Sequence, residues 1–104
     1  MSRKIELTKL YAKELASQIK NGSVDKSDLD KLIEDIAKGI PLESKYKDHN
    51  LAKHSPKEYQ GCREFHYKPN ICVVYRRTDD LVKLLRIGPH NKLGLTENID
   101  KAEL

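Results

Sequence analysis

Residues 63–77 read REFHYKPNICVVYRR, and this stretch decides the fold. In its first six residues, aromatic side chains alternate with the polar side chains of Glu64, His66 and Lys68, which is typical of a strand with one buried face. The following Pro-Asn pair favours a turn, and residues 71–77 are rich in the β-branched residues that favour strands. The stretch therefore predicts a hairpin in which a carboxylate and an imidazole lie side by side.

Three further strands are expected around this hairpin. Asp79 and Asp80 favour a second turn, and residues 81–87 are suited to continue the meander. An additional strand is expected around residues 46–51, and residues 3–7 are suited to a short edge strand. Together these segments predict a mainly antiparallel sheet.

Two amphipathic helices are predicted before the sheet. The first ends at Asn21, and the second is expected to open at a capping box formed by Ser27 and Asp30 and to end at Gly39. Their apolar stripes are Leu7, Leu10, Tyr11, Leu15 and Ile19 on the first helix, and Leu29, Leu32, Ile33, Ile36 and Ile40 on the second. We therefore predict an α+β fold. An N-terminal strand forms an edge of the sheet, a two-helix hairpin covers one face, and the other face is left for a functional site.

The length and hydropathy of the chain bound its class. Its 104 residues are enough for one domain with one modest core. No apolar run approaches the ~18 residues that cross a bilayer, and no apolar signal core follows Met1. We expect a protein of the cytoplasm that has no membrane partner.

The two cysteines lack the C-x-x-C spacing of zinc and redox sites. In the predicted hairpin, Cys72 faces His66 or Tyr67, depending on the length of the turn, and Cys62 faces a residue near Arg76. Two reduced thiols are expected, with Cys72 in the core. The sequence predicts neither a metal nor another cofactor.

Charge is distributed unevenly along the chain. Of a total net charge of +4, residues 53–92 carry nine Lys and Arg against four Asp and Glu, a net charge of +5. A basic segment that also holds most of the histidines suits a polyanionic ligand such as a nucleic acid.

Three of the four histidines fall in short motifs, which are Asp48-His49, Glu64-Phe65-His66 and Gly88-Pro89-His90. Histidine titrates near neutral pH, so a group of them beside Arg and Lys suits acid/base chemistry on a phosphodiester. A single histidine is more often plain polar surface, which is the expectation for His54.

The order of these motifs resembles the YafQ-like branch of the RelE/ParE superfamily, the small toxins of bacterial type II toxin–antitoxin pairs. After two helices come, in this order, Tyr46-Lys47-Asp48-His49-Asn50-Leu51, Arg63-Glu64-Phe65-His66, Val74-Tyr75-Arg76 and Leu84-Leu85-Arg86-Ile87-Gly88-Pro89-His90. The likeness covers about residues 3–95. It predicts a toxin domain over residues 1–95 and a short C-terminal extension over residues 96–104.

The resemblance implies an endoribonuclease that cuts mRNA on the ribosome, where it also contacts rRNA, without a metal. It implies silencing by a cognate antitoxin protein encoded next to the toxin. By this likeness, His90 is the candidate acid, and His49 or His66 is the base or positions the 2′-hydroxyl, with Glu64 beside them. Arg86 is the candidate phosphate clamp. Further candidates for RNA binding are Arg63, Lys68 and Arg77.

Four departures from the family pattern and several alternatives accompany this expectation. Gly94 or Leu95 stands where relatives have an aromatic residue, and the stretch over residues 52–60 is longer than usual and brings His54. Glu64 stands where relatives have Asp, and Asn70 stands where they have an acidic residue. Glu64 is also suited to pair with an arginine across the strands. Arg76 and Arg77 point to opposite faces of their strand, so only one of them can line the site. The competing functions are a ParE-like toxin that acts on DNA gyrase without catalysis, and a non-catalytic RNA-binding module.

Overall fold

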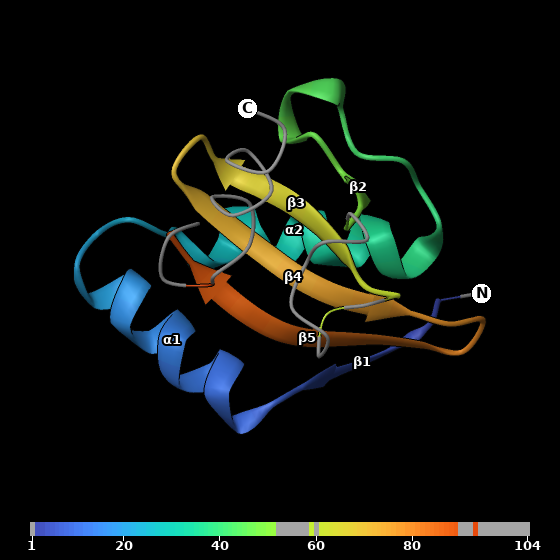
Figure 1. The fold of residues 1–104 in the computed structure, drawn as a ribbon, viewed down its shortest axis with the longest axis horizontal. Helices are drawn as coiled ribbons and strands as arrows, with labels where there is room; N and C mark the ends of the chain where they lie inside the picture. Colours follow the sequence, from blue (N-terminus) through green and yellow to red (C-terminus); the bar gives the residue numbers. More distant parts are fainter. Residues whose placement is uncertain (1, 52–58, 60, 90–92, 94–104) are drawn as a thin grey trace, which may run out of the picture.

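A five-stranded mixed sheet forms the centre of the molecule, in the strand order β1-β5-β4-β3-β2 (Figure 1). The computed structural model describes residues 2–51, 59, 61–89 and 93. Its elements are β1 (Lys4–Leu7), α1 (Lys9–Lys20), α2 (Lys26–Lys38), the 3₁₀ helix η1 (Ser44–Tyr46), β2 (His49–Asn50), β3 (Arg63–Lys68), β4 (Ile71–Arg77) and β5 (Leu81–Gly88). β1 runs parallel to β5, and the other neighbouring strands are antiparallel. The predicted α+β fold is confirmed.

The predicted hairpin is the β3–β4 pair. Glu64 pairs with Val74, and His66 pairs with Cys72, so Cys72 faces His66 rather than the alternative, Tyr67. Phe65 lies in the core beneath the helices. Because side chains alternate along a strand, Glu64 and His66 point to the opposite face. The expected separation of apolar and polar side chains on β3 is therefore confirmed.

Local hydrogen bonds explain where α1 begins and ends. The Thr8 hydroxyl accepts a hydrogen bond from the backbone N–H of Tyr11 at 3.0 Å, which caps the first turn. The helix closes at Asn21, as the sequence predicts.

The start of α2 differs from the prediction. Asp25 is the N-cap, and its Oδ1 accepts from the backbone N–H of Ser27 at 3.0 Å and from the Ser27 hydroxyl at 2.8 Å. The capping box expected from Ser27 and Asp30 is therefore wrong, because an acceptor two residues earlier already satisfies the free N–H groups. Gly39 ends α2 with φ 79°, a left-handed conformation that suits glycine. No described helix has the length and apolar character needed to cross a bilayer.

The main core lies between the sheet and α2, with Tyr11 of α1 also inside it. Figure 1 shows α2 behind the sheet and α1 beside β5. The predicted stripes are only partly buried, because α1 packs at the β5 edge and α2 ends before Ile40. The stripe residues left largely exposed are Leu10, Ile19 and Ile40, together with Leu7, which lies in β1 and not on the first helix as predicted.

The opposite face of the sheet is less open than expected. Tyr59, Cys62 and Leu93 pack there on Cys72 and Val74 and form a second, smaller apolar cluster. The strand expected over residues 46–51 is also shorter, because residues 44–46 form η1 and only His49–Asn50 pairs with β3. The second apolar cluster therefore occupies part of the face that was expected to be free for a site.

Candidate active site

Side chains from four strands form one row across the face of the sheet opposite α2. His49 pairs with Glu64, Glu64 pairs with Val74, and Val74 pairs with Arg86. Directly paired residues on neighbouring strands point to the same face. The row therefore carries an imidazole, a carboxylate and a guanidinium on one surface, although their positions are far apart in the sequence.

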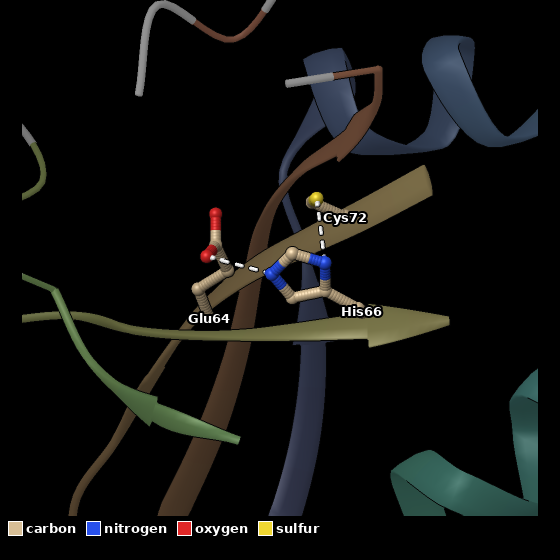
Figure 2. Close-up of side chains that lie close together, drawn as sticks. All are labelled: Glu64, His66 and Cys72. Carbon is tan, nitrogen blue, oxygen red and sulfur yellow. Dashed lines mark hydrogen bonds and ion pairs between the residues drawn. The ribbon is translucent and has the colours of Figure 1, made fainter. Parts of the chain in front are cut away.

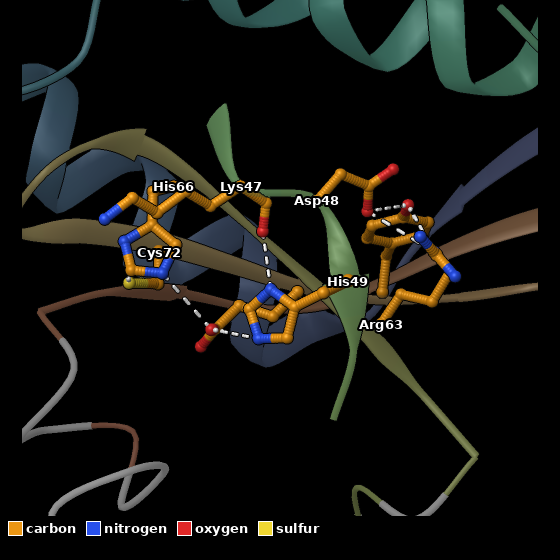
Figure 3. A network of polar contacts seen from close by, with 8 residues as sticks. Lys47, Asp48, His49, Arg63, His66 and Cys72 are labelled. Atoms are coloured by element: carbon orange, nitrogen blue, oxygen red, sulfur yellow. Dashed lines mark hydrogen bonds and ion pairs between the residues drawn. The ribbon is translucent and has the colours of Figure 1, made fainter. Parts of the chain in front are cut away.

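Glu64 is the buried anion of this row. Its Oε1 lies 3.3 Å from His49 Nε2 and 3.3 Å from His66 Nε2 (Figure 3). A carboxylate within ion-pair distance of two imidazoles stabilises a positive charge on either ring. Glu64 is also suited to pair with an arginine, but Arg63, its neighbour in the sequence, forms its ion pair with Asp48. The prediction that Glu64 and His66 lie side by side is confirmed.

The backbone of Lys47 orients the ring of His49. His49 Nδ1 lies 2.5 Å from the carbonyl oxygen of Lys47. A carbonyl only accepts hydrogen bonds, so Nδ1 carries the proton and Nε2 is the nitrogen that can take up or release one. Lys47 adopts φ 50°, a left-handed conformation that is uncommon for a residue with a Cβ. The His49 side chain is 45% exposed, so the ring borders solvent beside the buried Glu64.

His66 lies in the adjoining row, which continues through Cys72 to Gly88. Its Nδ1 lies 3.8 Å from Cys72 Sγ, and its Nε2 faces Glu64 (Figure 2). Burial, followed by the charge of Glu64, raises the pKa of the Cys72 thiol. The resting Cys72 is therefore a neutral thiol, and both cysteines are free, as predicted.

Arg86 is held by Glu14 of α1 and by Tyr59. Arg86 Nε and Nη2 donate to the two oxygens of Glu14 at 2.9 and 2.8 Å, and Nη1 donates to the Tyr59 hydroxyl at 2.6 Å. The hydrogen bonds and charge of Glu14 raise the pKa of Arg86, which keeps the guanidinium charged. These contacts use three of the five N–H groups. Within the described part of the chain, one N–H of Nη1 and one N–H of Nη2 have no hydrogen-bond partner. These two groups can donate to a phosphate oxygen.

Arg63 does not join this row. Its Nε lies 3.3 Å from Asp48 Oδ1 and 3.2 Å from the Tyr75 hydroxyl, which in turn donates to Asp48 at 2.6 Å. Figure 3 shows Asp48 and Arg63 on the side of His49 away from His66. The structure thus places this predicted RNA-binding residue in a polar network that supports the start of β2 and β3.

Arg77 also lies apart from the row. It is exposed at the end of β4, where it alternates with Arg76. Arg76 Nη2 donates to Cys62 Sγ at 3.5 Å, on the face that holds the second apolar cluster. By the alternation of a strand, Arg77 projects from the opposite face. The expectation that Cys62 faces a residue near Arg76 is confirmed.

Lys68 lines a pocket beside His66. The pocket has a volume of about 440 Å³, and its walls are Lys45, Tyr46, Lys47, His66, Tyr67, Lys68 and Pro69. Three of these side chains are lysines, and the imidazole forms one wall. A pocket of this composition suits a phosphate-bearing chain that continues from the reacting group.

Sequence reasoning missed Glu14 and Tyr59, and it missed Lys45 as part of the pocket. Glu14 lies on a helix far from Arg86 in the sequence, and no local pattern connects the two. Tyr59 stands in a stretch of sequence without hydrophobic periodicity. His90, the predicted acid, is outside the described residues, as is His54. Pro89 is the last described residue before His90, and it follows Gly88, which pairs with Cys72 in the row of His66.

The site combines two imidazoles around a buried carboxylate, a charged guanidinium and a lysine-lined pocket. Such groups can move protons and stabilise a phosphate without a further cofactor. Together with the fold, they define a small basic α+β protein with a row of titratable and basic side chains on one face of its sheet. The family described as the bacterial toxin of type II toxin–antitoxin systems, YafQ, matches this chain over residues 3–95. The chain belongs to this family.

Individual relatives agree with this assignment. The mRNA interferase toxin YafQ of Escherichia coli K12 is 35% identical over 54 residues, which is 52% of this chain and 54% of that protein. The match thus spans about half the length of the curated relative. Among solved structures, a copper-bound mutant toxin from Helicobacter pylori has a TM-score of 0.79 and 34% identity, covering 89% of this chain and 99% of that one. The E. coli DinJ–YafQ toxin–antitoxin complex has a TM-score of 0.74 and 31% identity, covering 89% and 98%.

Proposed function

We propose that this protein is the toxin of a type II toxin–antitoxin pair and acts as an endoribonuclease on mRNA in the ribosome. The single observation that carries the proposal is the placement of Glu64 between the imidazoles of His49 and His66. A surface used only for binding has no need of a buried carboxylate with an imidazole on each side. The relative in E. coli, an mRNA interferase, supports the same activity.

His49 is the base in this proposal. Its Nδ1 proton is held by the Lys47 carbonyl, so Nε2 can take the proton of the ribose 2′-hydroxyl. The imidazolium that results lies 3.3 Å from the Glu64 carboxylate, which stabilises it. His66 is less exposed, and on the other side of the same carboxylate it fixes the position of the charge.

Arg86 and His90 complete the chemistry. The two remaining N–H groups of Arg86 bind the non-bridging oxygens of the scissile phosphate, where negative charge accumulates as the 2′-oxygen attacks. His90 gives its proton to the departing 5′-oxygen. Its position two residues after Gly88 supports this role, because Gly88 ends the row that contains His66.

Lys45, Lys47 and Lys68 bind the RNA chain next to the scissile phosphate. They line the pocket beside His66 and carry the charge that a flanking phosphate requires. Arg63 and Arg77 lie off the row, so they are better placed for phosphates of rRNA or for more distant parts of the message than for the reacting group.

A cognate antitoxin is the second partner. The similar toxin from E. coli forms a toxin–antitoxin complex with DinJ. On this chain, an apolar groove of about 540 Å³ lies between β1, α1 and α2, and Ile5 and Leu7 at its edge are exposed. An apolar antitoxin segment that fills this groove lies against α1, the helix that holds Arg86 through Glu14.

Cleavage in a purified translation system tests the proposed activity. Stalled ribosomes programmed with a defined message are incubated with the wild-type protein, and the 5′ ends of the fragments are mapped. We expect cuts in phase with the codons that depend on ribosomes. DNA damage in growing cells without cut messages would instead support the gyrase-directed alternative. RNA binding without cuts or toxicity would support a non-catalytic module.

A further inference from the structure

We propose that Glu64, His66 and Cys72 form a binding site for a thiophilic divalent cation of the zinc type, and that the bound ion inhibits the enzyme. The inhibition rests on the proposed function, whereas the binding does not. Nothing in the acid/base reaction uses the Cys72 thiol, and its position against His66 is the observation that the reaction leaves unexplained.

The geometry of the three side chains is close to that of a metal site. One ligand atom from each residue can be chosen so that all three lie within 4.8 Å of one another. The Cys72 Sγ and His66 Nδ1 atoms are already 3.8 Å apart. Ligands of a tetrahedral zinc ion lie about 3.3–3.7 Å apart. The separations exceed this range by at most about 1 Å, so small changes of the side-chain torsions can bring the three atoms to one ion.

The ring of His66 is well placed to take part. Figure 2 shows it between Glu64 and Cys72, with one ring nitrogen toward each. Either nitrogen is therefore next to another ligand.

The ligand types select the metal. A thiolate, an imidazole and a carboxylate suit zinc, whereas magnesium and calcium prefer oxygen ligands alone. Glu64 and Cys72 are buried, and His66 remains 15% exposed, so the ion enters from the side of His66. Three protein ligands leave a fourth position open on a zinc ion.

Binding must displace the proton of Cys72. The thiol loses H⁺ as the sulfur–zinc bond forms, and no oxidation takes place. Because the proton and the metal compete for the sulfur, affinity increases with pH, as for other sites with a protonated ligand. The same ion engages the Glu64 carboxylate that His49 needs and fixes the ring of His66. Zinc and the cleavage reaction therefore compete for the same groups.

A cobalt titration tests the site directly. Co²⁺ is added to the metal-free chain, and the sulfur-to-cobalt charge-transfer band is recorded; Zn²⁺ then displaces the cobalt and gives the zinc affinity. We expect one ion per chain and a charge-transfer band in the wild type and in the matched control Cys62→Ser, whose thiol is also buried. Cys72→Ser should lose the band and bind zinc at least about tenfold more weakly. Even the loss of a group that only supports a ligand costs about 10–100-fold.

A second variant protects the test against misfolding of Cys72→Ser. His66→Gln keeps the thiol and changes a partly exposed side chain, and it should also weaken zinc binding by at least about tenfold. A wild type without the band, or a band unchanged in Cys72→Ser, would overturn the site. Zinc should stop mRNA cleavage and a chelator should restore it. Cleavage that continues at saturating zinc would overturn the inhibition, and absence of cleavage in the chelator would count against the proposed function alone.

Discussion

Both carboxylate oxygens of Glu14 on α1 accept hydrogen bonds from Arg86 on β5, from Nε at 2.9 Å and from Nη2 at 2.8 Å. The same carboxylate accepts a hydrogen bond from the backbone N–H of Ile87 at 3.2 Å. β1 pairs with β5 only as far as Leu84, so the backbone beyond that point needs another partner on this edge. The same carboxylate therefore satisfies the backbone at the edge of the sheet and orients Arg86, the proposed phosphate-binding residue.

Glu14→Gln should lower both stability and cleavage. The amide offers one acceptor where the carboxylate offers two, so Arg86 loses its two-point contact. We expect a loss of about 1–2 kcal/mol in the free energy of unfolding and at least a tenfold fall in cleavage rate, on the order of that caused by a misplaced catalytic group. Glu6→Gln, an exposed change on β1, is the matched control. A cleavage rate equal to that of the control would limit Glu14 to a structural role.

Arg86→Lys should impair cleavage although the positive charge is kept. A single ammonium cannot satisfy Glu14 and Tyr59 and also bind two phosphate oxygens. We expect the cleavage rate to fall by about tenfold or more, measured on ribosomes at saturating toxin. The matched control is Lys83→Arg, which changes another basic residue on β5. Wild-type cleavage by Arg86→Lys would mean that charge alone is used at this position.

His49→Gln, His66→Gln and His90→Ala should each reduce cleavage strongly, because a positioned proton donor or acceptor contributes about 10²–10⁴ in rate. The change His54→Ala should have little effect. Cleavage rates are compared after the melting temperature of each variant has been checked. A larger loss from the His54 change than from the other three would show that the site is elsewhere.

Asn70→Asp should preserve or raise activity. Asn70 lies exposed in the turn between β3 and β4, beside the lysine-lined pocket, at a position where the family resemblance predicts an acidic residue. A new carboxylate there has solvent access and needs no buried partner. Mapping of cut sites gives the rate and the position of cleavage together. A clear loss of rate would mean that the amide of Asn70 makes hydrogen bonds of its own to RNA.

Leu7→Asp should weaken the antitoxin complex. Leu7 is 52% exposed at the edge of the groove between β1, α1 and α2, and a charge there disfavours an apolar partner. We expect the variant and the product of the neighbouring gene to separate on size-exclusion chromatography after co-expression. Ile40→Asp, with similar exposure away from the groove, should remain in the complex. If the two variants behave alike, the antitoxin docks elsewhere.

Short-range pattern accounts for the part of the fold that the sequence predicted well. The alternation in residues 63–68 and the Pro-Asn turn predicted the hairpin, whereas they leave its register open, and only the structure pairs Cys72 with His66 rather than with Tyr67. Because side chains on a strand alternate strictly, the placement of Glu64 beside His66 also followed from the sequence. The start of α2 was mispredicted, because two adjacent capping candidates compete and only the folded chain selects Asp25.

The sequence by itself determined which chemical groups this protein has and which of them share a strand, since a strand fixes its side chains at a period of two. Only the tertiary structure decided which groups meet across strands and helices. The order β5-β4-β3-β2 brings Arg86, Glu64 and His49 into one row. The packing of α1 on β5 supplies Glu14. These contacts depend on strand order and helix packing, which are set by burial of the whole core and leave no local trace in the sequence.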